Sequence, residues 1–171
     1  MQSFAEMLKD ASIYTVKEIV KIVAEHPEKV KDLVKLTLTN KGSVSLRAAW
    51  TLTHCHEEMP HLLEPYVVEL LSACPDFTQT GARRSILKIM STVTIPDDYK
   101  VFLFDHCLQW LISKKEPIAV KAYAMDILTN IAIEEPDLKN EVIPAILDIM
   151  PNGSKGIRAK GKIMLKKLGC S

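Results

Sequence analysis

Apolar residues recur along this chain at helical spacing, three or four positions apart. Clear examples are Val30, Leu33 and Leu36; Val67, Leu70, Leu71 and Cys74; and Ile127, Leu128 and Ile131. Such spacing places the apolar side chains on one face of an α-helix. No alternating strand pattern persists for more than a few positions. The pattern therefore predicts an all-α fold of about ten helices in five pairs, joined by short loops.

Four of the predicted pairs share one order of elements, and each opens at a proline. The prolines are Pro27, Pro60, Pro96 and Pro136. Each is followed by a helical apolar stretch, a polar break and a second helix that begins with a basic residue. Proline suits a first helical position, because its fixed φ fits and its missing N–H would be unpaired there. Upstream, residues 3–10 and 14–25 predict a shorter fifth pair.

The basic residues near the starts of the second helices recur at a constant interval. They are Arg47, Arg84, Lys121 and Arg158, each 37 residues after the one before. A tandem helix pair of this length is the unit of an α-solenoid. We expect one domain, residues 1–171, of five repeats with approximate bounds 1–26, 27–58, 59–94, 95–134 and 135–171. The alternative is a compact irregular helical bundle, which does not require this register.

The second helices also resemble a known family. The segments VSLRAAWTL from Val44 and IAVKAYAMDIL from Ile118 are similar to the V-x-x-basic-small-x-A-x-x-L pattern of HEAT repeats. PDLKNEVIPAILDIM from Pro136 resembles their proline-opened first helices. The resemblance runs from about residue 12 onward. It implies a right-handed α-solenoid whose second helices line a concave face.

One feature departs from the family. HEAT repeats commonly carry an Asp about six residues before the basic residue, and the two form an internal ladder. The corresponding residues here are Lys41, Thr78, Lys115 and Asn152. The basic residues of this chain therefore lack the partner that the resemblance implies.

The four basic residues suggest a positive stripe along the concave face. Every Arg of the chain lies at or beside this position: Arg47, Arg83, Arg84 and Arg158. Arg suits bidentate contacts with carboxylates and phosphates. The functional hypothesis is a groove for an acidic peptide or a phosphate backbone, lined by Arg47, Arg84, Lys121 and Arg158. The structural alternative is that each guanidinium donates to carbonyls or acids of the preceding turn.

Two further residues bring aromatic and acidic groups to this hypothetical groove. Trp50 follows Arg47 by three positions and shares its helix face, and Asp126 shares a face with Tyr123 and Asn130. A resemblance to HEAT-like DNA glycosylases, which place such residues around an alkylated base, implies an alternative function in nucleic-acid binding. The structural alternative for Trp50 is core packing between repeats.

The C-terminal segment is strongly basic. Residues 152–171 hold six cations and no acid, whereas residues 96–135 are net acidic. Lys162 lies on one helical stripe with Lys155, Arg158 and Lys166. The stripe predicts contact with an acidic partner or nucleic acid; the alternative is a solvated cap of the last repeat.

Other clusters favour structural roles. In the run from His54 to Glu58, no more than two metal-ligand types share a helix face, so we expect no metal site. Cys107 and the neighbouring His106 diverge on a helix, which predicts Cys107 in the core and Asp105 outside. Gly-rich phosphate loops and HExxH or GxSxG motifs are absent from the sequence. We expect no cofactor and no enzymatic activity.

We expect a cytoplasmic protein with reduced thiols. The net charge is only +1, and the sequence shows no signal peptide and no membrane span. Its four Cys include no CxxC pair. The favoured function is a non-enzymatic protein-interaction scaffold or adaptor that binds an acidic or extended partner segment. The alternatives are a nucleic-acid-binding protein and a regulatory subunit of a larger enzyme. The sequence indicates neither the partner nor the oligomeric state.

Overall fold

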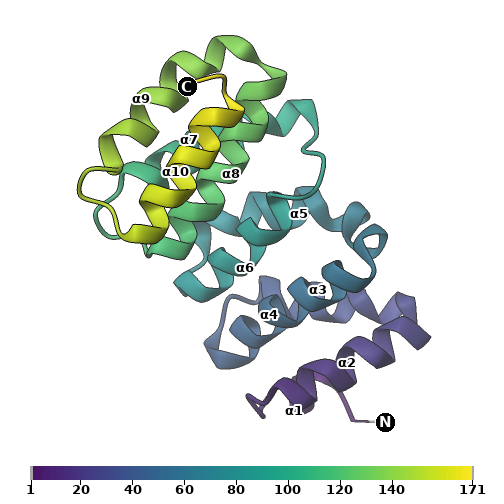
Figure 1. The fold of residues 1–171 in the computed structure, drawn as a ribbon. Coiled ribbons are helices and arrows are strands. Elements are labelled where there is room, and N and C mark those ends of the chain that lie inside the picture. The colour runs from purple at the N-terminus through teal and green to yellow at the C-terminus, as the bar shows by residue number, and fades with distance from the viewer. Residues whose placement is uncertain (1, 171) are drawn as a thin grey trace. The chain divides into compact units, whose positions relative to one another are not determined.

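A computed structural model describes residues 2–170, which form ten α-helices with short 3₁₀ turns and, within this range, no strand (Figure 1). The all-α prediction is confirmed. The helices are α1 (Phe4–Met7), α2 (Ile13–Glu25), α3 (Val30–Leu38), α4 (Gly42–Glu58), α5 (Val67–Ala73), α6 (Thr80–Met90), α7 (Asp97–Ile112), α8 (Ile118–Glu134), α9 (Lys139–Ile149) and α10 (Lys155–Lys167).

The predicted opening prolines begin turns more often than α-helices. Pro27, Pro60 and Pro136 are the first residues of the 3₁₀ turns η1 (Pro27–Lys29), η2 (Pro60–Tyr66) and η4 (Pro136–Leu138), which lead into α3, α5 and α9. Pro96 is the N-cap of α7. A 3₁₀ turn also leaves its first N–H groups unpaired, so the physical reason for proline at these positions is unchanged.

The chain divides into two compact units, residues 1–89 and 90–171. In unit 1 the first helices of successive pairs pack in order, α1 on α3 and α3 on α5, and the second helices α2 and α4 pack on each other. α3 and α4 pack together as a pair. The core of this unit consists of fully buried aliphatic side chains, including Leu33, Leu52, Leu63, Leu70 and Leu71.

Unit 2 repeats this arrangement with two helix pairs. α7 packs on α8 and α9 on α10 within the pairs, while α7 contacts α9 and α8 contacts α10 between them. Leu103, Cys107, Leu111, Met125 and Leu128 are among its fully buried or nearly buried core residues. In both units, first helices therefore contact first helices and second helices contact second helices, which is the packing of tandem helical repeats.

Three of the four Cys are buried, namely Cys55, Cys74 and Cys107, and Cys170 is half-buried. Asp105 is exposed beside the buried Cys107, as the sequence predicts. Among residues 2–170, no helix combines the length and apolar character needed to cross a membrane.

Candidate functional site

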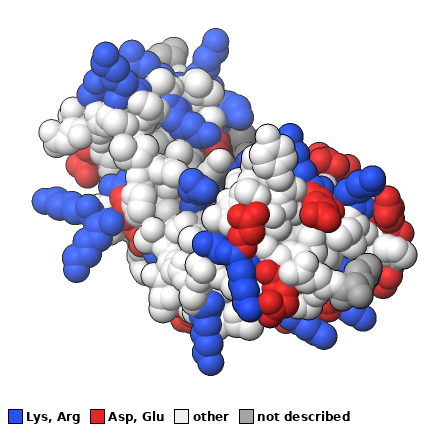
Figure 2. Space-filling view, turned by 90° about the horizontal axis from the view of Figure 1, so that it is seen from below, with Lys and Arg blue, Asp and Glu red and all other residues white. Residues whose placement is uncertain are grey.

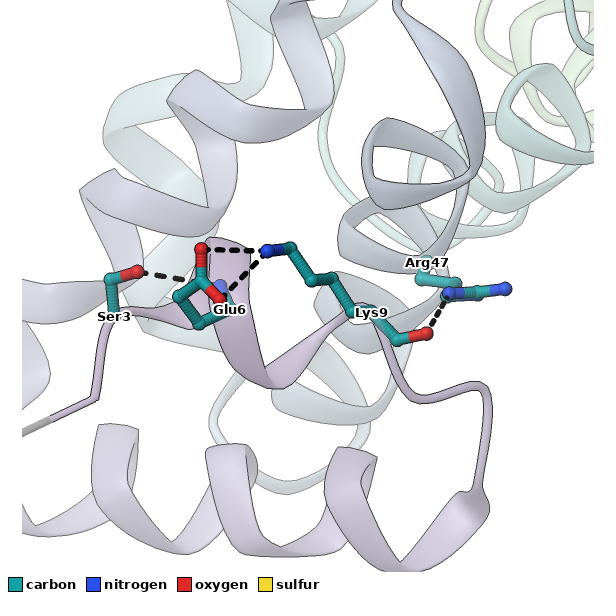
Figure 3. A network of polar contacts seen from close by, with 4 residues as sticks. All are labelled: Ser3, Glu6, Lys9 and Arg47. Atoms are coloured by element: carbon teal, nitrogen blue, oxygen red, sulfur yellow. Dashed lines mark hydrogen bonds and ion pairs between the residues drawn. The ribbon is translucent and has the colours of Figure 1, made fainter.

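Arg47 holds the end of the first helix. Its Nη1 donates hydrogen bonds to the backbone carbonyls of Leu8 and Lys9, at 2.8 and 2.7 Å. These carbonyls follow the last turn of α1, where carbonyl groups lack intrahelical partners and the helix dipole is negative. Figure 3 shows the guanidinium of Arg47 beside the Lys9 backbone, while the Lys9 side chain reaches Glu6 instead. Arg47 thus links α4 to the preceding helix pair.

The two adjacent arginines of α6 have different surroundings. Arg83 donates to the backbone carbonyls of Cys74, Pro75 and Phe77, at 3.0–3.4 Å, and so caps the chain around η3 (Cys74–Asp76). Arg84 is exposed, and its side chain forms no hydrogen bond or ion pair with the part of the chain that the structure describes. Arg83 therefore has the structural role, and Arg84 presents its charge to solvent.

The burial pattern divides the evenly spaced basic residues into two sets. Buried positions of the second helices recur as three equivalent series: Ser45, Ala82, Val120 and Ile157; Ala49, Ile86, Ala124 and Gly161; and Leu52, Ile89, Ile127 and Met164. Within each series, successive members are 37, 38 and 37 residues apart. Arg47 and Arg84 each lie two residues after a member of the first series, so they occupy equivalent positions. Lys121 and Arg158 each lie one residue after a member of that series, which is the position of Arg83. The constant interval in the sequence is not one structural register.

Arg158 and Lys121 occupy the start of their helices in unit 2. Nη1 of Arg158 donates to the carbonyl of Gly153 at 2.7 Å, and the residue remains exposed. Lys121 is half-buried, and its side chain forms no hydrogen bond or ion pair within residues 2–170. Both cations are available to an external acid, and Arg158 is oriented by its single carbonyl contact.

Trp50 is half-buried on α4 and stacks edge-on against His54, with ring centroids 5.5 Å apart and an interplanar angle of 70°. Nδ1 of His54 lies 3.2 Å from a carboxylate oxygen of Glu57, and Lys88 of α6 contacts the other oxygen. The hydrogen bond from Lys88 lowers the pKa of the Glu57 carboxyl. This network connects α4 to α6 inside unit 1.

Asp126 has a partner that the sequence did not indicate. Its Oδ2 forms an ion pair with Nζ of Lys160 at 2.5 Å, and the two side chains are 20% and 29% exposed. The pair joins α8 to α10. Asn130, one turn further along α8, donates its side-chain amide to the carbonyl of Ser91 at 3.1 Å. The polar residues of α8 are thus used to hold unit 2 together.

The exposed face of α10 carries four cations without an acidic partner. Lys155, Arg158, Lys162 and Lys166 are all exposed, and in the described part of the chain none of them meets a carboxylate. Lys162 and Lys166 line a hollow of about 690 Å³ together with Leu147, Leu165, Gly169 and Cys170. Leu147 is 51% exposed there. We call these four cations and this hollow the α10 cationic surface.

A comparison with protein-family models settles the family. The model for the HEAT repeat domain matches residues 4–168 of this chain. The chain belongs to the HEAT repeat family. Comparisons with curated protein sequences and with solved structures gave no match.

Membership of the HEAT repeat family agrees with the way first and second helices pack within each unit. The fold is therefore an all-α solenoid. HEAT repeats form helical scaffolds that often mediate interactions, and proteins built from them are generally non-enzymatic.

Burial shifts the pKa of two titratable groups of α4 in this HEAT repeat domain. Burial raises the pKa of the Cys55 thiol to about 12, so it stays protonated at neutral pH and is a poor nucleophile. Burial also lowers the pKa of His56. Among residues 2–170, no three His, Cys, Asp or Glu side chains are placed to hold a metal ion.

Sequence reasoning and structure differ over which polar residues act on the surface. The structure brings Lys162 and Arg158 together on α10, and it leaves Arg84 free in unit 1. It places Arg47 and Asp126 in internal contacts. The sequence left open which arginines donate to backbone carbonyls, and the structure gives this role to Arg47, Arg83 and Arg158. Helical spacing gave no sign of Lys160 as the partner of Asp126.

Proposed function

We propose that this HEAT repeat domain is a protein-interaction scaffold that binds an acidic, extended segment of a partner on the α10 cationic surface. The observation that carries the proposal is the exposure of Lys155, Arg158, Lys162 and Lys166 on one helix with no carboxylate beside them. Four like charges on one helix face repel each other. An acidic ligand removes that repulsion and adds charge-assisted contacts.

The hollow beside Lys162 and Lys166 supports a peptide partner. Its lining includes the apolar side chains of Leu147 and Leu165, so it offers burial to one aliphatic or aromatic residue of the ligand. Acidic residues on either side of that residue reach the two lysines. Lys121 and Arg84 present further cations on other second helices. Arg47, Trp50 and Asp126 contribute to this function by maintaining the helix packing.

The charge distribution favours a peptide over a nucleic-acid backbone. The net charge of the chain is only +1. Figure 2 shows one face on which Lys and Arg side chains are interspersed with Asp and Glu and do not form one continuous basic area. Nucleic-acid backbones attract extended positive fields that neutralise many phosphates.

The test is fluorescence anisotropy with a labelled Asp- and Glu-rich peptide that contains one central leucine. The Lys162→Glu/Lys166→Glu variant should bind at least tenfold more weakly, because two attractions become repulsions. The matched control is Lys31→Glu/Lys35→Glu, which makes the same charge change on two exposed lysines one turn apart on α3. Equal binding by the two variants contradicts the proposal.

A duplex DNA probe at about 50 and about 200 mM salt serves as the competing ligand. The proposal expects DNA to bind more weakly than the acidic peptide at both salt concentrations. DNA binding that is tighter than peptide binding, collapses with salt and is lost in Lys162→Glu/Lys166→Glu would replace the scaffold function with nucleic-acid binding.

A further inference from the structure

A second hollow, of about 490 Å³, lies within unit 2 between α7, the end of α8 and the start of α9. Its lining includes the buried side chains of Phe104 and Ile131 and the half-buried Leu138. Val101 stands at the same hollow with 72% of its surface exposed. This hollow therefore has an apolar floor and one aliphatic side chain that the core of unit 2 leaves uncovered.

Carboxylates surround the apolar floor. Asp105, Glu135, Asp137 and Glu141 line the hollow, and all four are exposed. None of them forms a hydrogen bond or ion pair through its side chain with any residue that the structure describes. We call the floor and these four acids the acidic hollow.

The cation in this lining is already neutralised. Nζ of Lys100 lies 2.7 Å from carboxylate oxygens of both Asp97 and Glu134, and its side chain is only 16% exposed. The hydrogen bonds to Asp97 and then to Glu134 raise the pKa of Lys100, which keeps the ammonium charged. Lys100 therefore offsets Asp97 and Glu134, and the four remaining carboxylates have no counter-charge in the lining.

We propose that the acidic hollow binds a cationic amphipathic segment of a partner protein, in which one aliphatic side chain is flanked by Lys or Arg. The aliphatic side chain packs against Val101, Phe104 and Leu138. The flanking cations contact Asp105 and Glu135. The acidic hollow attracts a cationic ligand, whereas the α10 cationic surface attracts an acidic one. Binding at the acidic hollow is therefore a second function, which does not depend on the proposed one.

The apolar floor favours a peptide segment over an inorganic cation as the ligand of the acidic hollow. Among residues 2–170, no three acidic, His or Cys side chains converge closely enough to ligate one metal ion. Separated carboxylates around an apolar floor match instead a ligand whose charges are spread along a chain and whose centre is apolar. Exposed aliphatic side chains in a hollow rimmed by polar groups are typical of protein interaction sites.

The experiment titrates the intact protein into a labelled synthetic peptide with a central leucine flanked by lysines. The variant Asp105→Lys/Glu135→Lys should lower the affinity at least tenfold, and Val101→Ser should lower it several-fold. The matched control Glu64→Lys/Glu69→Lys makes the same charge change on two exposed acids of unit 1 and should leave the affinity unchanged. Fluorescence of the buried Trp110 confirms that unit 2 stays folded in each variant.

A second peptide, in which serine replaces the leucine, separates docking from charge attraction alone. The proposal expects this peptide to bind at least fivefold more weakly. Equal binding of the two peptides, or an equal loss in Glu64→Lys/Glu69→Lys, overturns the proposal, because non-specific attraction then accounts for the binding.

Sedimentation of the protein alone tests another occupant, the basic α10 of a second copy. The proposal expects a monomer at every concentration that the peptide titration uses. Concentration-dependent association that Asp105→Lys/Glu135→Lys abolishes would overturn the partner-protein occupant in favour of self-association. Failure of the α10 peptide test leaves this result unaffected, since the two surfaces share no residue.

Discussion

Lys160 of α10 and Asp126 of α8 form an ion pair, with Nζ and Oδ2 2.5 Å apart, between helices of two successive helix pairs. Both side chains are more than two-thirds buried. The four other cations that lie in α10's exposed stripe have no such partner. In α10, Lys160 therefore serves helix packing, whereas the four exposed cations face solvent. We propose that these four cations bind the partner.

The Asp126–Lys160 pair should stabilise unit 2. We expect Lys160→Met to lower the free energy of unfolding by about 1–2 kcal/mol, because the substitution leaves a largely buried carboxylate without its cation. Urea unfolding followed by Trp110 fluorescence in a Trp50→Phe background reports on unit 2 alone. Lys162→Met, on the exposed stripe, should change the stability by less than about 0.5 kcal/mol. Equal effects of the two variants would show that the ion pair contributes nothing.

Arg47 should protect α1 from local opening. We expect Arg47→Met to speed amide hydrogen exchange of residues 4–10 about tenfold, because two carbonyls at the end of α1 lose a charged donor. Hydrogen–deuterium exchange with mass spectrometry measures this change peptide by peptide. Arg84→Met is the matched control, since Arg84 is the equivalent residue on α6 and has no such contact. An unchanged exchange rate in Arg47→Met would contradict the anchoring role.

Two glycines of α10 should respond oppositely to alanine. A Cβ at Gly156 would have 3.8 Å to its nearest neighbour, so Gly156→Ala should stabilise unit 2 by about 0.5 kcal/mol through helix propensity. A Cβ at Gly161 would lie 2.6 Å from Sδ of Met150 and 3.3 Å from Cγ2 of Ile146. Gly161→Ala should therefore destabilise the unit by about 1 kcal/mol. Urea unfolding followed by Trp110 fluorescence compares them, and stabilisation by both would refute the close packing of α9 and α10.

The buried thiol of Cys55 should make stability fall at high pH. Its pKa is raised by burial to about 12, whereas an exposed thiol ionises near pH 8.5. The unfolded chain therefore loses the thiol proton first, and the folded state loses stability as the pH rises from about 8.5 toward 12. Between pH 8 and pH 10, wild type should lose about 1–2 kcal/mol more than Cys55→Ala, as measured by urea unfolding. Equal losses in the two proteins would contradict the burial of an un-ionised thiol.

The helical pairs were predictable from sequence because they rest on local patterns. Apolar spacing and the prolines at positions 27, 60, 96 and 136 mark the helix pairs, and the structure places a turn or a helix start at each. The repeat bounds near residues 26, 58, 94 and 134 stay a prediction. The division into residues 1–89 and 90–171 was not predicted, because it depends on contacts between helices rather than on periodicity.

The roles of the cations were less predictable. Arg83 and Arg84 are neighbours in sequence, yet only the turn around Phe77 determines which of them finds carbonyl acceptors. Lys160 pairs with Asp126 across 34 residues, a relationship that helical spacing cannot reveal. The net acidic character of residues 96–135 was visible in the sequence, but the hollow that gathers four of the acids requires the packing of α7 and α9.

The central claim is that α10 binds an acidic segment, and amide chemical shifts of isotope-labelled protein test it most directly. On titration with the Asp- and Glu-rich peptide, we predict shifts that concentrate on residues 155–167 and at Leu147, with residues 30–38 of α3 unchanged. Shifts spread evenly over all exposed lysines, or concentrated on α3, would contradict the account.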